Sequence, residues 1–351
     1  MIKKFINFLN KNYLSKINKN FMDNEIDRIE RNLKKKKNFY YFLDENTHGF
    51  SIGTYLYTLF FLRYFVIQGK FVNIIYIEGL HPKYKKLNKK DLKYYRKNFK
   101  YFAKIILKKN FSIKKIKKFQ KESFYRNLIN EHILMKQKLI KNETLHNYIA
   151  YMLNKMLLKK KKLLKKYFIT IKKNDLRNVS KKVNLNKRFI TVSLRYDINF
   201  PKNRNINSHF LNKLIFFLIK KFKNHKIIIL SDIGGTRMMK KMISQDLSKK
   251  VIFSKDLSNH ISVDLFLLFN SVNNIGTTFT GGLFESLLFT QKPFFHHGRY
   301  SISHNKVFSE NHSFDKRKRF FWNTKKQIWI PTINHCDPED IFIKIDKFLT
   351  I

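Results

Sequence analysis

The sequence contains little cysteine, glycine, proline and tryptophan, and few acidic residues. Its single cysteine, Cys336, excludes an intramolecular disulfide framework and any cysteine-based zinc site, and is compatible with a reducing compartment. The first residues are basic but include neither a sustained apolar stretch nor a small-residue cleavage site, so no signal peptide is predicted. The GxGxxG and P-loop patterns do not occur either. Disulfide scaffolds and the common nucleotide-binding motifs are thereby excluded.

Positive charge, in contrast, is abundant. Lysine and arginine number 73 against 24 acidic residues, which gives a formal net charge of +49. Such a charge attracts phosphate-rich partners at long range. Lysine, asparagine, isoleucine and phenylalanine are nevertheless frequent everywhere, as in A/T-rich coding sequences, so the charge is weak evidence for a partner. With 43% hydrophobic residues the chain is predicted to be globular, and its length favours two domains.

Long hydrophobic runs are also scarce. The longest apolar window, Ser51–Ile67, contains Arg63 and leads straight into a strand-like run, so we predict a core helix rather than a membrane span. Basic and phenylalanine-rich faces leave open a peripheral contact with an anionic membrane.

The first half is predicted to contain a basic extension over residues 1–37 and a domain over residues 38–185. From Phe39 the pattern is strand, turn, apolar helix and strand, the last being FVNIIYIEG. Residues 83–175 are rich in lysine and are predicted to be helical. In one such helix, capped by Asn142 or Thr144, a set of apolar residues shares one face: Leu145, Ile149, Met152, Leu153, Met156 and Leu157. The run KKKKLLKK is predicted to be a solvated helix end, with polyanion binding as the alternative.

In the second half, strands alternate with helices. The segments FITVSL, KIIIL, KKVIFSKDL, NNIG and KPFFHHG are predicted strands, and amphipathic or apolar helices separate them. This alternation predicts a parallel, Rossmann-like sheet over residues 186–335, so the fold class is α/β. A terminal helix begins at Pro338, with Asp337 as its N-cap.

Ligands of open α/β sheets bind at the carboxyl ends of the strands, and polar residues occur at three such ends. Arg195 and Asp197 follow FITVSL, with Arg204 further on; they suit a phosphate or carboxylate, or form a strand-end salt bridge. Ser231 and Asp232 follow KIIIL, where they contact a ribose or base or cap the next helix.

The third strand end is IGTTFTGG. Thr277, Thr278 and Thr280 offer hydroxyl groups, while Gly281 and Gly282 allow close backbone approach. A helix predicted from residue 283 directs amide groups toward this turn. The segment is therefore predicted to bind an anion.

A loop in the first half, DENTHGFSIG, opens the apolar helix. His48 there is a candidate base or phosphate ligand, or a histidine that caps the helix. The histidines at 296, 297, 304, 312 and 335, together with Cys336, fit no zinc spacing and have no DxD-like carboxylate pair, so no metal is predicted.

Taken in order, ITVSLRYD, IIILSD and VDLFLLFNSVNNIGTTFTGGLFESLLF resemble the donor-binding half of GT-B glycosyltransferases, and most closely the fucosyltransferase-like superfamily. The resemblance covers residues 40–80 and 186–351. It implies two Rossmann-like domains that face a cleft, with the lysine-rich helical segment as an insertion. It also implies that the helix over residues 336–351 crosses back to the N-terminal domain. Such enzymes have a histidine two positions before the arginine, where this sequence has Ser193. This departure counts against GDP-fucose as the donor.

The resemblance implies transfer of a sugar from a nucleotide-diphosphate donor to a glycan or lipid-linked saccharide, without a metal or other cofactor, in the cytoplasm or at the inner membrane face. Alternatives are a polysaccharide pyruvyltransferase-like enzyme and a basic nucleic-acid-binding protein, although no specific nucleic acid is expected. The implied catalytic residues are Arg195, Asp197 and His48. The implied donor-binding residues are Arg195, Arg204, Ser231, Asp232, Thr278, Thr280, Gly281, Gly282 and Glu285, and the acceptor-side loop comprises His48, Gly49, Ser51 and Gly53.

Overall fold

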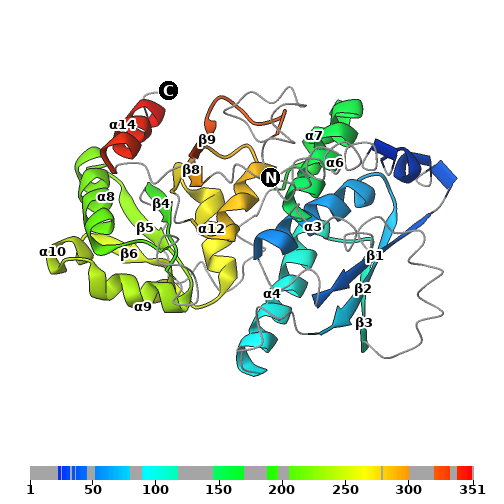
Figure 1. Ribbon diagram of the computed structural model, residues 1–351, viewed down its shortest axis with the longest axis horizontal. Coiled ribbons are helices and arrows are strands. Elements are labelled where there is room, and N and C mark those ends of the chain that lie inside the picture. The colour runs from blue at the N-terminus through cyan, green and yellow to red at the C-terminus, as the bar shows by residue number, and fades with distance from the viewer. Residues whose placement is uncertain are drawn as a thin grey trace, which may run out of the picture. The chain divides into compact units, whose positions relative to one another are not determined.

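The computed structural model describes most of the chain as two compact units, one up to Tyr167 and one from Phe168 onward (Figure 1). The described residues are 23–24, 26–31, 34–35, 37–45, 52–79, 89–117, 145–169, 188–196, 205–277, 280–299, 320–332 and 338–349. The predicted domain boundary at 185/186 and most of the predicted basic extension over 1–37 lie outside these ranges. Each unit is described by itself.

The first unit contains a three-stranded parallel sheet in the order β1-β2-β3. β1 (Asn38–Asp44) and β2 (Phe71–Glu78) are joined by α3 (Ile52–Val66), which confirms the predicted strand, helix and strand. α4 (Lys89–Leu107) then leads to β3 (Phe111–Lys117). β3 corrects the prediction that residues 83–175 are helical. Lys108 and Asn110 have positive φ values of 62° and 61°, which end the helix, and the chain then pairs with β2.

α3 is a core helix, as predicted, because every residue from Tyr55 to Phe65 is buried. Its charged residue, Arg63, is only 5% exposed and donates hydrogen bonds to carbonyl oxygens of Ile106 (2.5 Å), Lys166 (2.7 Å) and Tyr167 (2.6 Å). These carbonyls lie at the ends of two other helices, where backbone oxygens lack partners within the helix. Among the described residues, no helix is both long and apolar enough to cross a membrane.

α6 (Leu145–Lys159) buries the predicted apolar face against α3. Ile149, Met152, Leu153 and Met156 are at most 1% exposed, so the methionines are core residues. A short 3₁₀ turn, η3 (Lys161–Leu163), and α7 (Leu164–Tyr167) follow.

The second unit is a six-stranded sheet in which all pairs are parallel. Its strands are β4 (Phe189–Ser193), β5 (Lys226–Leu230), β6 (Val251–Phe253), β7 (Asn273–Gly276), β8 (Phe294–Arg299) and β9 (Gln327–Thr332). They lie in the order β6-β5-β4-β7-β8-β9. Counted from the first strand of this unit, that order is 3-2-1-4-5-6, the order of dinucleotide-binding Rossmann sheets. The prediction of a Rossmann-like second half is confirmed.

Helices join these strands, and the sequence predicted each of the longer ones. They are α8 (Ser208–Lys221), α9 (Ile233–Met242), α10 (Gln245–Ser248), α11 (Ser254–Leu257), α12 (Ile261–Asn270) and α14 (Pro338–Leu349). Asn207 caps α8, since its side chain accepts a hydrogen bond from the Phe210 amide at 2.8 Å. α12 is buried along its whole length from Ile261 to Phe269.

Four details of the second unit differ from the prediction. KKVIFSKDL was predicted to be a strand throughout, but β6 ends at Phe253 and α11 follows, closed by a hydrogen bond from the Ser258 amide to the Ser254 carbonyl at 3.1 Å. The segment after β7 forms a 3₁₀ helix, η6 (Gly282–Phe289), rather than an α-helix. β9 was not predicted, because only pairing with β8 makes this short run a strand. α14 was expected to cross back to the first domain, but it belongs to the second unit, where Ile341, Ile345 and Phe348 pack into the core.

Candidate functional site

The carboxyl ends of β4, β5 and β7 lie side by side. Ser193, the last residue of β4, is in register with Leu230 at the end of β5 and with Gly276 at the end of β7. The chain leaves β4 toward β5 on one side, whereas β7 lies on the other, so β4 and β7 flank the switch point of the sheet. The three segments that were predicted to bind a ligand therefore begin at neighbouring strand ends along the same edge of the sheet. Open α/β sheets bind their ligands at such a point.

Thr280 closes the turn after β7 and ties it to β4. Its Oγ1 accepts a hydrogen bond from the Thr277 amide at 2.6 Å and donates one to the Ser193 carbonyl at 3.0 Å. The hydroxyl thus holds the two strand ends together at the switch point. Its role in the structure is to shape the turn that the sequence predicted as an anion site.

Gly276 is required by close packing. A Cβ atom at this position would lie 2.6 Å from His296 Cδ2, 2.9 Å from Thr280 Oγ1 and 3.0 Å from Phe284 Cε1. Any larger residue would push the Thr280 turn away from β4. The glycine therefore explains how the turn after β7 fits so closely over the sheet.

Asp232 is the N-cap of α9. Its side chain accepts a hydrogen bond from the Gly235 amide at 2.6 Å, so of the two predicted roles the structure shows the capping role. Beside it, Ser231 Oγ is shielded from solvent and has no hydrogen-bond partner among the described residues. A Cβ on Gly235 would come within 2.4 Å of that oxygen and 3.1 Å of the Tyr196 carbonyl.

Arg195 directly follows β4 and is half-buried. Its carbonyl accepts a hydrogen bond from the Ile206 amide at 3.3 Å, which fixes the backbone as the chain returns toward α8. Arg195 therefore lies two residues after the end of β4, one of the two strands that flank the switch point. A planar cation in this place suits a phosphate or carboxylate.

A buried ion pair joins the two helices that follow β6 in the chain. Lys255 on α11 contacts Asp264 on α12, and both side chains are only 5% exposed. Burial raises the pKa of Asp264, the charge of Lys255 opposes that shift, and Asp232 adds to it. Asp264 lies in the segment VDLFLLF that carries the resemblance, whereas its lysine partner was not predicted.

Several predicted site residues lie outside the described ranges: His48, Gly49, Ser51, Asp197, Arg204 and Thr278. Of the others, Gly53 is buried in the first turn of α3, Gly281 caps η6, and Gly282 and Glu285 lie on η6, each partly accessible. The assigned roles of these residues remain predictions.

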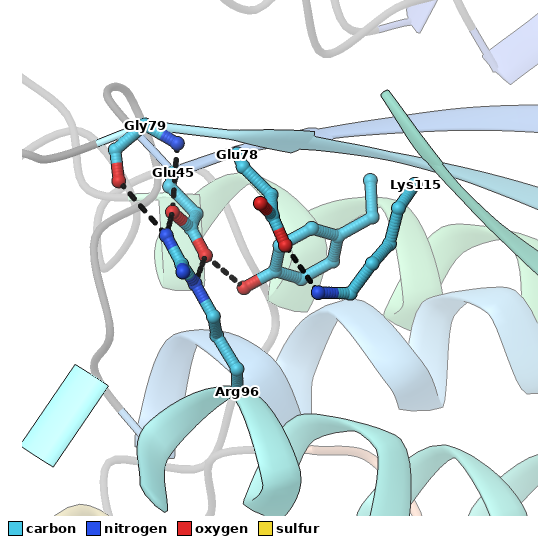
Figure 2. Close-up of polar contacts among 6 residues, drawn as sticks. Glu45, Glu78, Gly79, Arg96 and Lys115 are labelled. Atoms are coloured by element: carbon cyan, nitrogen blue, oxygen red, sulfur yellow. Dashed lines mark hydrogen bonds and ion pairs between the residues drawn. The ribbon is translucent and has the colours of Figure 1, made fainter. Parts of the chain in front are cut away.

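The first unit has a polar cluster that the sequence did not predict (Figure 2). Glu45, only 1% exposed, follows β1 and accepts hydrogen bonds from the Tyr76 hydroxyl (2.5 Å), the Gly79 amide (2.7 Å) and Arg96 Nε and Nη2 (both 2.7 Å). The bond to Glu45 raises the pKa of Arg96. A carboxylate that immediately follows a strand was the only sequence signal for this cluster. It clamps the carboxyl ends of β1 and β2 to α4.

The adjacent histidines of β8 lie on opposite faces of the sheet. The His296 ring stacks on Trp329, with centroids 4.0 Å apart, and contacts Phe284. His297 is fully buried, and burial together with the charge of Lys344 lowers its pKa to about 4. In the described part of the chain, no three histidine, cysteine or acidic residues group as metal ligands do.

No known protein family and no curated protein matches the sequence. Solved structures that are similar to the chain include the following two. The structure of E. coli ADP-heptose LPS heptosyltransferase II has a TM-score of 0.43 at 6% identity, covering 85% of this chain and 95% of that chain. The structure of the glycosyl transferase family 9 protein from Veillonella parvula DSM 2008 has a TM-score of 0.43 at 8% identity, covering 90% and 97%. Both scores are too low for the likeness to carry an argument about function.

Proposed function

We propose that the protein is a glycosyltransferase that takes a sugar from a nucleotide-diphosphate donor and passes it to a glycan or lipid-linked saccharide. The observation that supports this most is the row formed by the ends of β4, β5 and β7 at the switch point of a 3-2-1-4-5-6 sheet. Sheets of this order bind nucleotides at that point. Arg195 supplies the cation that a diphosphate requires there.

Transfer breaks the bond between the anomeric carbon and the diphosphate, which leaves with the electron pair. The acceptor hydroxyl forms the new glycosidic bond and loses its proton to a base. In the proposal, Arg195 and backbone amides of the turn after β7 stabilise the negative charge that develops on the leaving diphosphate. Asp197 and His48 stay candidate bases on sequence grounds alone.

Metal independence and the identity of the sugar also belong to the proposal. The sequence has no DxD-like pair, so we expect activity to survive EDTA. A GDP-fucose-like donor stays one candidate among the nucleotide sugars.

The test is a thermal-shift and calorimetric screen of the full chain against sugars linked to ADP, GDP, UDP, CMP and dTDP, and against phosphoenolpyruvate. A ligand at about 100 times its Kd stabilises the folded state by about 2.7 kcal/mol, which raises the Tm measurably. Arg195→Ala should weaken binding at least about 10-fold, because a charged group then loses its partner. Arg188→Ala is the matched control: it removes the same charge at the amino end of the same strand, where the residue is exposed.

A Tm rise with a nucleotide sugar that Arg195→Ala abolishes and Arg188→Ala preserves would support the proposal. The absence of a Tm rise and of a calorimetric signal with every nucleotide sugar would overturn it. A response to phosphoenolpyruvate alone would favour the pyruvyltransferase reading instead.

A further inference from the structure

A concentrated patch of lysine and leucine lies on the surface of the first unit, from Leu158 to Lys166; it is called here the Lys–Leu patch. Its lysines are Lys159, Lys160, Lys161, Lys162, Lys165 and Lys166, all exposed except Lys160, which is half-buried. No aspartate or glutamate occurs anywhere from residue 145 to residue 168. The sequence had predicted a solvated helix end here, with polyanion binding as the alternative.

Only one of these lysines has an acidic partner in the described part of the chain. Lys159 lies 3.6 Å from Asp27 and 3.3 Å from Glu30. Lys160 donates to Gln68 at 2.6 Å and lies over the Tyr64 ring at 5.7 Å. The remaining four face solvent without a compensating carboxylate among the described residues. Neutralising the dipole at the end of α6 needs only cations in its last turn, whereas the patch continues beyond it.

Leucines interrupt the lysines and are not fully buried. Leu158 is 47% exposed, and Leu163 and Leu164 are half-buried. Together with Gln68, the run from Leu158 to Leu163 lines an open hollow of about 680 Å³. The patch therefore combines apolar side chains, cations and a recess large enough for a lipid headgroup.

Buried side chains of the first unit hold the backbone of the patch in place. Arg63 donates to the carbonyl oxygens of Lys166 and Tyr167 at 2.7 and 2.6 Å, and the Tyr167 hydroxyl donates to the Phe60 carbonyl at 2.9 Å. Because these bonds hold the last turn onto α3, the lysines are presented on a rigid surface.

We propose that the Lys–Leu patch binds the surface of an anionic lipid bilayer. Ammonium groups pair with lipid phosphates while leucines and the aliphatic stems of lysines enter the boundary of the acyl chains. Nucleic acid fits less well, because single strands are bound by exposed aromatic rings and arginines, and the patch has neither: Tyr167 is fully buried. This surface is independent of the proposed transfer reaction.

The test is flotation of the full chain with vesicles of neutral phosphatidylcholine, with or without about 30% phosphatidylglycerol, at about 0.1 M salt. Each lysine near an anionic surface contributes about fivefold to the partition coefficient, so Lys161→Gln with Lys162→Gln should lower it about 25-fold. Leu158→Ser should lower it about fivefold without any change in charge. Lys249→Gln with Lys250→Gln, an exposed pair in the second unit, removes equal charge and should change little.

Circular dichroism and melting of each variant establish that the fold is retained. The proposal is overturned if the control pair lowers binding as much as the patch pair, since the overall charge then suffices. It is equally overturned if Leu158→Ser has no effect, or if the patch pair abolishes binding to single-stranded DNA rather than to vesicles. Binding to neutral vesicles alone would also contradict it.

Discussion

Acidification is expected to destabilise the second unit through His297. This histidine lies on β8 and is 0% exposed, and neither ring nitrogen has a hydrogen-bond partner among the described residues. On the same face of the strand, Phe295 contacts Phe348 of α14, with ring centroids 5.7 Å apart. A proton on His297 would place a charge in this apolar layer.

The size of the effect follows from the pKa of His297, which burial and the charge of Lys344 lower from 6.5 to about 4, with Asp340 opposing the shift. Above pH 6.5 both the folded and the unfolded state hold a neutral ring. Below pH 6.5 the ring is protonated in the unfolded state, whereas in the folded state it stays neutral down to about pH 4. The free energy of unfolding therefore falls as the pH falls from 6.5 to about 4. The loss reaches about 3 kcal/mol when complete, and about 2.5 kcal/mol at about pH 4.5.

Urea unfolding followed by tryptophan fluorescence measures this loss, because both tryptophans, Trp322 and Trp329, lie in the second unit. Carboxylates titrate in the same range, so the measured quantity is the difference between the wild-type protein and His297→Leu at each pH. That difference should shift by about 2.5 kcal/mol in favour of the variant between about pH 7.5 and about pH 4.5. Phe295→Leu, which removes no titratable group, should lower stability equally at every pH. Parallel pH profiles for the wild-type protein and His297→Leu would refute the reasoning.

Three further changes test the buried polar groups. Arg63→Met leaves three carbonyls without their donor and should lower the free energy of unfolding by about 3 kcal/mol or more, measured by denaturant titration; a cost under about 1 kcal/mol would show that water replaces the guanidinium. Glu45→Gln should lower the stability of the first unit by about 2 kcal/mol, seen in a melt, and an unchanged Tm would mean that Arg96 finds another partner. Asp264→Asn strands the Lys255 charge and should cost about 3–5 kcal/mol, whereas Lys255→Met with Asp264→Leu should recover most of it; a double variant as unstable as the single one would contradict this.

The order of elements in the second unit could be predicted because strand and helix periods there agree with the tertiary structure. A buried run such as Lys226–Leu230 is a strand both by local preference and by its place in the sheet. The adjacency of Arg195, Ser231 and Thr280 also followed, since parallel strands bring their carboxyl ends to one edge. Local pattern did not reveal β3, whose lysines hide its apolar alternation and which needs β2 as a partner.

The state of each site group could not be predicted, because it depends on atoms distant in sequence. The Thr280 hydroxyl is engaged by a carbonyl 87 residues earlier, and Glu45 is bound by an arginine 51 residues later. A sequence identifies Thr280 as a polar residue at a strand end. Only the fold shows that this hydroxyl fastens two strands together.

The three bonds of Arg63 also bear on synthesis of the chain. Its most distant partner, the Tyr167 carbonyl, is 104 residues further on. At about 5–20 residues per second, a ribosome needs about 5–20 s to make that stretch. During much of this interval α3 is already made, while the helix end at Lys166 and Tyr167 that will accept two of its hydrogen bonds does not yet exist. The Arg63 contacts can therefore be completed only after α7 has been made, and until then α3 is the segment that a chaperone would need to shield.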